Sequence, residues 1–231
     1  MNLVVFDLDG TLAQTFAIDE QCFLRAFSEG LGIDNIDRDR SAYEHVTDSG
    51  VVNQVCRERL GRDPSASDAQ MFVSCFVGQL QRHYDESPDA FCETPGAAML
   101  LELLQQSQCA VAIATGGFER SARFKAQAAG LAIADLPAAF AEDGPAREAI
   151  VQAAITRAAS RYGRSKFDRI VSVGDAVWDV RTAKRLGLPF VGVATDAKEA
   201  QMRALGTSHV VRDFVDGAHC IQCFEEATVP T

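Results

Sequence analysis

The sequence of 231 residues has no continuous apolar stretch of the roughly 18 to 20 residues that a membrane helix needs. It has no run of lysine or arginine, and its net charge of -10 argues against a nucleic-acid partner, because binding a phosphate backbone requires a concentrated basic face. Its N-terminus shows no basic region followed by an apolar core and a cleavage site. We therefore expect a cytoplasmic protein without membrane or nucleic-acid partners, which could take a small anionic substrate only through local cations or a metal ion.

Cysteine and histidine give no sign of a disulfide framework or of a metal site. The seven cysteines are an odd number, and without a signal peptide they are expected to be reduced thiols. Cys220-x-x-Cys223 has the spacing of half a zinc site, but no second pair of ligands lies nearby. We interpret these two cysteines as structural or surface sulfur.

Apolar runs alternate with helical patterns over most of the chain. Continuous apolar runs are expected where helices cover both faces of a parallel sheet. Such runs predict four strands, a weaker fifth and an edge strand, at 2–6, 109–114, 169–173, 189–194, 136–142 and 209–211. Helical patterns lie between them, at 96–107, 118–129, 145–161, 176–186 and 197–205. This order predicts an α/β fold built on a doubly wound parallel sheet.

One long segment breaks the alternation. Between Thr15 and Pro88 no strand is predicted, and amphipathic helical patterns cover IDEQCFLRAF, GVVNQVCRERL and AQMFVSCFVGQLQRHY. Pro88 and the turn Thr94-Pro95-Gly96 mark the return to the alternating pattern. We therefore expect an α/β core formed by residues 1–14 and 89–231, with a helical cap formed by residues 15–88 and inserted after the first strand.

Polar residues follow three of the predicted strands. The first strand runs into Asp7 and Asp9, which lie two residues apart, so an extended chain turns both side chains to the same side. The second is followed by Thr115-Gly116-Gly117, and the strand at 169–173 by Gly174-Asp175, with Asp179 close behind. In a doubly wound sheet, ligands bind beyond the carboxyl ends of the strands. We expect these three segments to form one site.

The acids of this site suggest a metal ion and a nucleophile. Crowded carboxylates are costly unless a cation joins them, and Mg²⁺ prefers oxygen ligands. Asp7, Asp9 and Asp175 therefore predict a magnesium site, with Asp179 as a further ligand or an orienting group. Asp7 could attack phosphorus as a carboxylate nucleophile. Asp9 could protonate the leaving oxygen and later accept a proton from the hydrolytic water.

These motifs resemble those of the haloacid dehalogenase-like (HAD) superfamily, over nearly the whole chain. The resemblance implies a Rossmann-like core in which Asp7 becomes an aspartyl-phosphate and Asp9 is the general acid/base that binds Mg²⁺ through its backbone carbonyl. It also implies that Thr115 hydrogen-bonds the transferring phosphoryl group, and that Asp175 binds the metal beside its acidic partner Asp179. The helical segment that follows the first motif is similar to the family's cap, which covers the site from that position.

The resemblance implies one more element, a lysine that neutralises the phosphate and Asp7. Many relatives carry it just before the fourth-motif strand, where this sequence has Gly144-Pro145-Ala146-Arg147 instead. A subset carries it on the helix after the second motif, where this sequence has Lys125. We favour Lys125 over Arg147. With Thr115 and Gly116, Lys125 and the nearby Arg120 are the candidate substrate-binding residues.

The second acid selects among the reactions of the family. Relatives that dehalogenate lack an acid at the position of Asp9, and relatives that cleave carbon–phosphorus bonds use a cap lysine, whereas residues 15–88 contain none. The resemblance therefore implies a Mg²⁺-dependent phosphatase acting on a small phosphorylated metabolite. One alternative is a phosphotransferase or mutase similar to the β-phosphoglucomutase relatives. Another is a non-catalytic binding protein that kept the fold, against which the cost of unused buried carboxylates argues.

Substrate selection is expected to lie in the cap. Thr47 and Asp48, in HVTDSGVVNQV, resemble a cap element of phosphoglycolate-phosphatase-like relatives and could approach the site. The same two residues are equally typical of a helix N-cap. Arg25 and Arg57 are further candidates for contact with a substrate anion, although both lie on helical patterns where such side chains usually face solvent.

Overall fold

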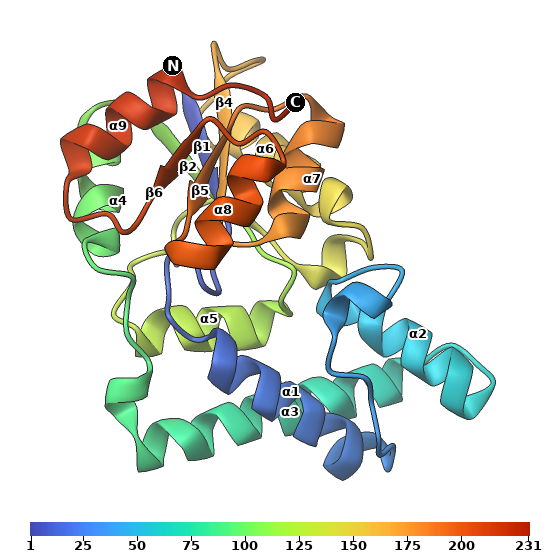
Figure 1. Cartoon of the computed structure of the whole chain (residues 1–231). Coiled ribbons are helices and arrows are strands. Elements are labelled where there is room, and N and C mark those ends of the chain that lie inside the picture. The colour runs from blue at the N-terminus through green and yellow to red at the C-terminus, as the bar shows by residue number, and fades with distance from the viewer.

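The computed structural model describes residues 1–231 and contains one six-stranded sheet whose strands all run parallel. The strands are β1 (Leu3–Phe6), β2 (Ala110–Ala114), β3 (Ala138–Ala139), β4 (Ile170–Gly174), β5 (Phe190–Val193) and β6 (His209–Val211). Their order in the sheet is β3-β2-β1-β4-β5-β6 (Figure 1). The chain moves outward from β1 first to one side and then, from β4, to the other, so the strand order reverses between β1 and β4.

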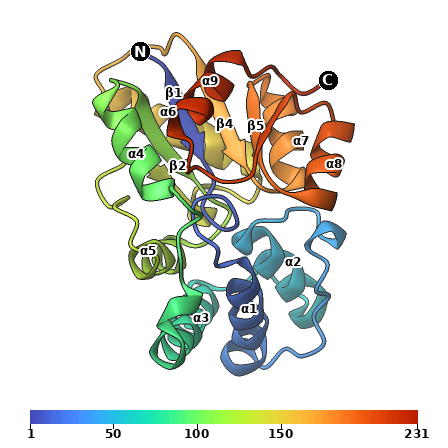
Figure 2. The same cartoon turned by 60° about the vertical axis from the view of Figure 1, so that its left-hand side comes forward.

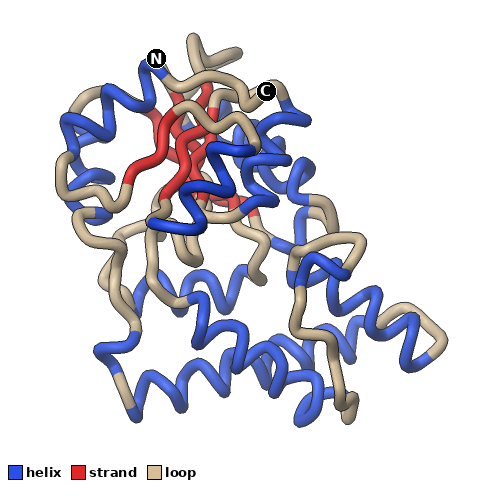
Figure 3. Tube along the Cα trace, in the orientation of Figure 1, coloured by secondary structure: helices blue, strands red, loops and turns tan.

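Nine α-helices cover the faces of this sheet or lie beyond one end of its strands. They are α1 (Phe16–Leu31), α2 (Asp48–Leu60), α3 (Ala66–Glu86), α4 (Ala97–Gln106), α5 (Glu119–Ala128), α6 (Arg147–Arg161), α7 (Val177–Leu186), α8 (Asp196–Ala204) and α9 (Gly217–Glu226). Helices α1, α2 and α3 lie together below the sheet, and α5 lies between α3 and the sheet (Figures 1 and 2). All strands lie in the upper part of the molecule, at the end that also carries both chain termini (Figure 3). None of the helices combines the length and apolar character that a membrane crossing requires.

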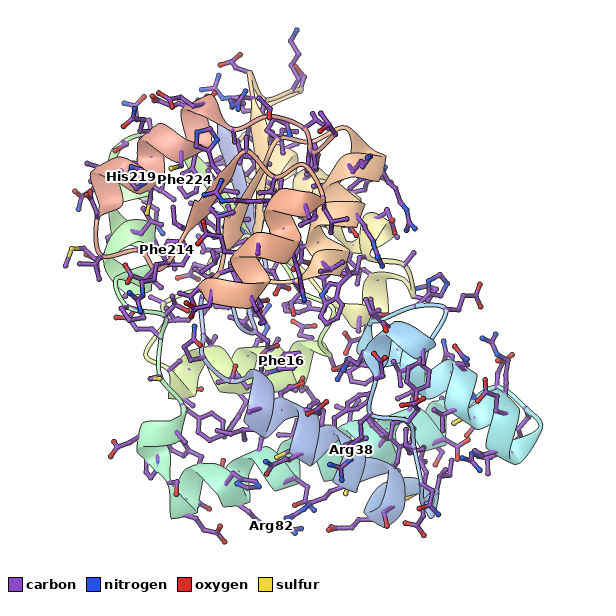
Figure 4. All side chains as sticks on the ribbon, in the orientation of Figure 1. Phe16, Arg38, Arg82, Phe214, His219 and Phe224 are labelled. Carbon is purple, nitrogen blue, oxygen red and sulfur yellow. The ribbon has the colours of Figure 1, made fainter.

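The alternation of side chains along the strands creates two apolar layers. Val4 and Phe6 of β1 belong to a cluster that includes residues of α4 and α9, and the ring of Phe6 contacts the rings of Phe214 and Phe224, which Figure 4 labels on that side of the sheet. Leu3 and Val5 face the opposite way, into a cluster that contains residues of α6. Both faces of the sheet are thus covered, which explains the continuous apolar runs of the strands.

Helices α1, α2 and α3 have an apolar core of their own. Its centre is a group of phenylalanine rings in mutual edge contact, among them Phe23, Phe27, Phe72 and Phe76. Phe118, in the loop before α5, joins this core, with its ring centroid 6.1 Å from that of Phe72. Helices α1, α2 and α3, called the helical layer below, therefore pack directly against the loop that follows β2.

The chain enters and leaves the helical layer at adjacent points. The backbone N–H of Gln14 donates to the carbonyl of Cys92, and that of Thr94 donates to the carbonyl of Leu12. Such a pair of neighbouring crossings is what the expected insertion of a cap after the first strand requires. The boundaries of that cap, at residues 15 and 88, stay a prediction.

The predicted fold class is confirmed, and all six predicted strands are found at or close to the predicted residues. The one helix that the sequence analysis did not identify is α9, which holds Cys220 and Cys223. Both thiols are buried in the core cluster on the α9 side of the sheet and belong to no group of metal ligands. Their spacing reflects one face of a helix that packs on the sheet.

The phenylalanine core provides a stability test in which neighbouring residues of α3 serve as variant and control. Phe72 is fully buried, whereas the side chain of Met71 is half exposed. We expect Phe72→Ala to lower the free energy of unfolding by about 3 to 5 kcal/mol, because it removes a buried ring and leaves a cavity. Met71→Ala should change it by less than about 0.5 kcal/mol. Urea denaturation measures both, and similar midpoints for the two variants would contradict the described packing.

Candidate active site

The three polar segments that follow β1, β2 and β4 meet at one edge of the sheet. The three strands are neighbours, so their carboxyl ends bring Asp7, Thr115 and Asp175 together. This edge lies at the reversal of strand order, where ligands bind in doubly wound sheets. A cavity there is lined by all three residues and by residues of the helical layer. The structure therefore brings the three predicted segments into one site.

Three carboxylates form a compact group on the sheet side of the cavity. Ligand atoms of Asp7, Asp175 and Asp179 all lie within 4.8 Å of one another, and the three residues are buried. Gly10 permits this approach: its φ is +82°, and a Cβ atom there would lie 2.3 Å from an Asp175 carboxylate oxygen. The glycine of the DLDG stretch is thus required both by the turn and by the carboxylate above it.

The electrostatics of this group call for a cation. Burial raises the pKa of Asp7 well above its usual value, although Arg147 acts in the opposite direction. Burial, followed by the neighbouring Asp179, raises the pKa of Asp175 to about 6. A divalent ion bound by hard oxygen donors would relieve this cost, and the three carboxylates fit such an ion. The side chain of Asp9, by contrast, is not part of the group.

Arg147 is the cation that faces Asp7. One terminal nitrogen of its guanidinium lies 3.0 Å from the Asp7 carboxylate and 2.5 Å from that of Asp179. Its Nε atom is buried and has no hydrogen-bond partner. Burial would lower the pKa of Arg147, but the charges of Asp179 and Asp7 outweigh it and raise the pKa. A Cβ atom at Gly116 would lie 2.8 Å from this guanidinium, so the glycine makes room for it.

Lys125, which the sequence analysis favoured as the partner of Asp7, lies elsewhere. Its Nζ is 2.6 Å from an oxygen of Asp9 and also contacts Asp19 of helix α1. Burial would lower the pKa of Lys125, but the two carboxylates outweigh it and raise the pKa. The geometric reason is that α5 packs on α3 of the helical layer, whereas α6 begins with Arg147 next to Asp7. The expected contact with Asp7 is therefore made by Arg147.

The three other arginines proposed as anion contacts do not line the cavity. Arg120 is exposed and donates a hydrogen bond to Ser74 of α3. Arg25 and Arg57 are exposed on their helices. The helical pattern that argued for solvent exposure of Arg25 and Arg57 describes them correctly.

The start of α2 is docked on the loops that surround the site. The Thr47 hydroxyl accepts the Gly50 N–H as a helix cap and donates to the carbonyl of Pro145, while Thr47 itself does not line the cavity. The hydroxyl of Ser49 donates to the carbonyl of Ala141. Since Pro145 immediately precedes the Ala146-Arg147 step, this contact ties the helical layer to the segment that carries Arg147.

Asp48 makes the corresponding contacts with the loop after β2. Its backbone N–H donates to the carbonyl of Gly116, and its carboxylate accepts the N–H of Phe118. The same carboxylate receives Arg40, whose terminal nitrogen lies 2.9 Å away. Helix α2 therefore begins in direct contact with the Thr115-Gly116-Gly117 segment.

Arg40 and Asp19 are two cavity residues that the sequence analysis missed. Arg40 lies 3.7 Å from Asp19, and its guanidinium stacks at 4.4 Å from the centroid of the Phe23 ring. Burial raises the pKa of Asp19 to about 7, and Lys125 opposes the shift. Arg40 lies in the polar break IDNIDRDRS, where no periodic pattern of apolar residues indicates which side chains are buried. Asp19 could have been found, because it lies four residues after Thr15, on the side of the helix that the apolar pattern predicts to be buried.

The buried pair of Lys125 with Asp9 and Asp19 predicts a large stability effect. Lys125→Met leaves two carboxylates without their cation in a buried position, which should lower the free energy of unfolding by about 3 to 5 kcal/mol. The matched control is Arg123→Gln on the same helix, whose partner Glu119 is half exposed, and we expect a loss below about 1 kcal/mol. Chemical denaturation of both variants measures the difference. Equal losses would contradict the described burial of the Lys125 pair.

Comparison with known proteins places this geometry in a family. The family model described as haloacid dehalogenase-like hydrolase matches residues 1–187. Among solved structures, a hydrolase from Pseudomonas syringae is 22% identical, with a TM-score of 0.71 over 99% of this chain and 100% of that one. The fold is shared by a putative β-phosphoglucomutase from Bacteroides vulgatus, which is 15% identical with a TM-score of 0.66 over 99% of this chain and 90% of that one. It is also shared by a predicted phosphoglycolate phosphatase from Haemophilus somnus, which is 18% identical with a TM-score of 0.58 over 95% of this chain and 97% of that one. No curated protein matches the sequence. With the family model covering most of its length, the chain belongs to the haloacid dehalogenase-like hydrolases.

Proposed function

We propose that the protein hydrolyses a small phosphate monoester through an aspartyl-phosphate formed on Asp7. The observation that carries this proposal is the position of Asp7: a buried carboxylate at the end of β1, paired with Arg147 and grouped with Asp175 and Asp179. Arg147 can stabilise the negative charge of the transferring group from one side, and a metal ion held by the three carboxylates would stabilise it from the other.

The chain's own residues account for the first transfer. An Asp7 oxygen attacks phosphorus, the bond from phosphorus to the ester oxygen breaks, and Arg147 stabilises the charge on the transferring group. The Thr115 hydroxyl accepts the N–H of Gly117, at 3.1 Å, which leaves its own proton free to donate to a phosphoryl oxygen. The backbone of Gly116 lies beside this hydroxyl and can approach the same anion because it carries no side chain.

Asp9 is the proposed proton carrier. It protonates the leaving oxygen in the first step and accepts a proton from the attacking water in the second. Its two carboxylate oxygens are held by Thr15 and by Lys125, each at 2.6 Å. We therefore assign Lys125 to positioning Asp9, and Arg147 to the phosphoryl group, in place of the expected contact between Lys125 and Asp7.

Asp7, Asp175 and Asp179 are the side chains proposed to hold Mg²⁺, and by family resemblance the backbone carbonyl of Asp9 contributes as well. When bound, Mg²⁺ offsets the charge of the carboxylates and polarises the phosphoryl group. Lys198, whose Nζ lies 2.8 Å from Asp175, faces the same group from α8 and is more than half exposed. Its exposed side chain can leave Asp175 without unfolding any element.

A mutase is the second candidate, and one observation favours it. Two structures with the same fold carry the description putative β-phosphoglucomutase. In such an enzyme a sugar hydroxyl, rather than water, receives the phosphoryl group from Asp7. A non-catalytic role fits less well, because five carboxylates around one cavity are a stability cost without a use.

The first test of the reaction is phosphate release from p-nitrophenyl phosphate and a panel of phosphorylated metabolites. We expect activity in Mg²⁺ that is abolished by Asp7→Asn and reduced about 10²- to 10⁴-fold by Asp9→Asn, which removes proton transfer. The control is Asp135→Asn, an exposed acid outside the cavity, which should retain full activity. Undiminished release by Asp7→Asn would refute the nucleophile. Transfer to a sugar phosphate without release of phosphate would favour the mutase.

Binding of Mg²⁺ can be tested without any substrate. A ligand that binds only the folded state at a hundred times its Kd stabilises it by about 2.7 kcal/mol, so Mg²⁺ should raise the melting temperature relative to EDTA. Asp175→Asn should lose this increase, whereas Asp135→Asn should keep it. Melting curves that are identical in Mg²⁺ and EDTA for the wild type would contradict the proposed metal site.

A further inference from the structure

We propose that the alcohol released from the substrate is small and carries no negative charge of its own. The substrate class is then the phosphate monoesters of short neutral or amino-bearing alcohols, and not those of hydroxy acids or bisphosphates. This inference rests on the proposed phosphatase function and concerns the side of the same cavity that faces away from Asp7.

The two sides of the cavity have different residues. The phosphoryl group is assigned to the sheet side, where Asp7, Thr115 and Arg147 lie. The opposite side is formed by the helical layer, with Asp19 from α1, Arg40 from the connection between α1 and α2, and Asp48 from the start of α2. Phe16, labelled in Figure 4 at the start of α1, also lines the cavity, as do Val46 and Trp178. The alcohol must lie among these residues.

No cation on the helical side is free to receive an anion. Arg40 is bound to the Asp48 carboxylate and to the carbonyl of Val46, and it lies 3.7 Å from Asp19. Lys125 is held between Asp9 and Asp19. The cavity residue with a buried, unpartnered polar atom is Arg147, through its Nε, and it belongs to the phosphoryl side.

Carboxylates also outnumber cations around the alcohol. Three acids lie there, Asp9, Asp19 and Asp48, and they already share the two cations Arg40 and Lys125. Oxygens of Asp9 and Asp48 both face Gly117, since each lies 3.7 Å from the Cβ position of that glycine. A carboxylate on the alcohol would therefore meet like charges, whereas a hydroxyl or an ammonium group would find acceptors.

The space is also small. Helix α2 is docked through Thr47, Asp48 and Ser49, and the Asp48 N–H and carboxylate bind the Gly116 carbonyl and the Phe118 N–H directly. These contacts bring the helical side close to the loop after β2, which favours a short alcohol over a sugar ring or a nucleoside.

The experiment compares esters of equal size and different charge on the wild-type protein in Mg²⁺. 2-Hydroxyethyl phosphate, phosphoethanolamine and 2-phosphoglycolate share a two-carbon chain that ends in a hydroxymethyl, an aminomethyl or a carboxylate group, and kcat/KM is measured for each. We expect the first two to exceed phosphoglycolate by about tenfold or more, because like-charge contacts oppose the carboxylate. Equal or faster hydrolysis of phosphoglycolate would overturn the inference and assign Arg40 to a substrate anion.

A variant assigns the selectivity to its residues. Asp48→Asn removes one charge and keeps an oxygen that can accept the Phe118 N–H, so the ratio of kcat/KM for hydroxyethyl phosphate to phosphoglycolate should fall. Glu44→Gln, an exposed acid of the same connection, should leave the ratio unchanged. An unchanged ratio in Asp48→Asn would contradict the role of that carboxylate. Absence of hydrolysis of every ester, p-nitrophenyl phosphate included, would instead refute the proposed phosphatase and with it the inference.

Discussion

The contact between Arg147 and Asp7 is the interaction on which the site depends. Asp7, Asp175 and Asp179 are buried together, and burial and mutual repulsion oppose their ionised forms. A guanidinium stays protonated in such surroundings, and its fixed fork can serve two carboxylates at once. Arg147 does so from the first residue of α6, at the edge where the strand order reverses. The fold thus delivers a permanent cation to the nucleophile.

A second cation organises the helical side in the same manner. Lys125 joins Asp9, next to the nucleophile, to Asp19 of the helical layer, while Thr47, Asp48 and Ser49 dock α2 on the loops of the sheet. The acid proposed to carry the proton is therefore linked by ion pairs to the element that closes the cavity. Separating the helical layer from the sheet would open the site to water and, at the same time, change the ion-pair partners of Asp9.

The strands and the acids that follow them could be predicted from the sequence, whereas the pairing of the cations, the role of Arg40 and helix α9 could not. Apolar runs mark strands covered on both faces, and acids directly after such runs can only lie at a sheet edge, so Asp7 and Asp175 were identified. The pairing of cations depends on how helices are placed in space, which periodicity does not encode. The sequence analysis therefore favoured Lys125 as the partner of Asp7, whereas Arg147 makes that contact. Arg40 was missed because it lies in a segment that shows no periodic pattern of apolar residues. Helix α9 is short and cysteine-containing, and it follows a weak edge strand.

The formation of a covalent phosphoenzyme on Asp7 can be tested directly. Rapid quenching during turnover, followed by borohydride reduction, converts an aspartyl-phosphate to homoserine, and peptide mass spectrometry then identifies its position. We expect homoserine at residue 7 in the wild type and in the slower Asp9→Asn variant. Turnover that leaves Asp7 unmodified, or a phosphoryl group on any other residue, would contradict it.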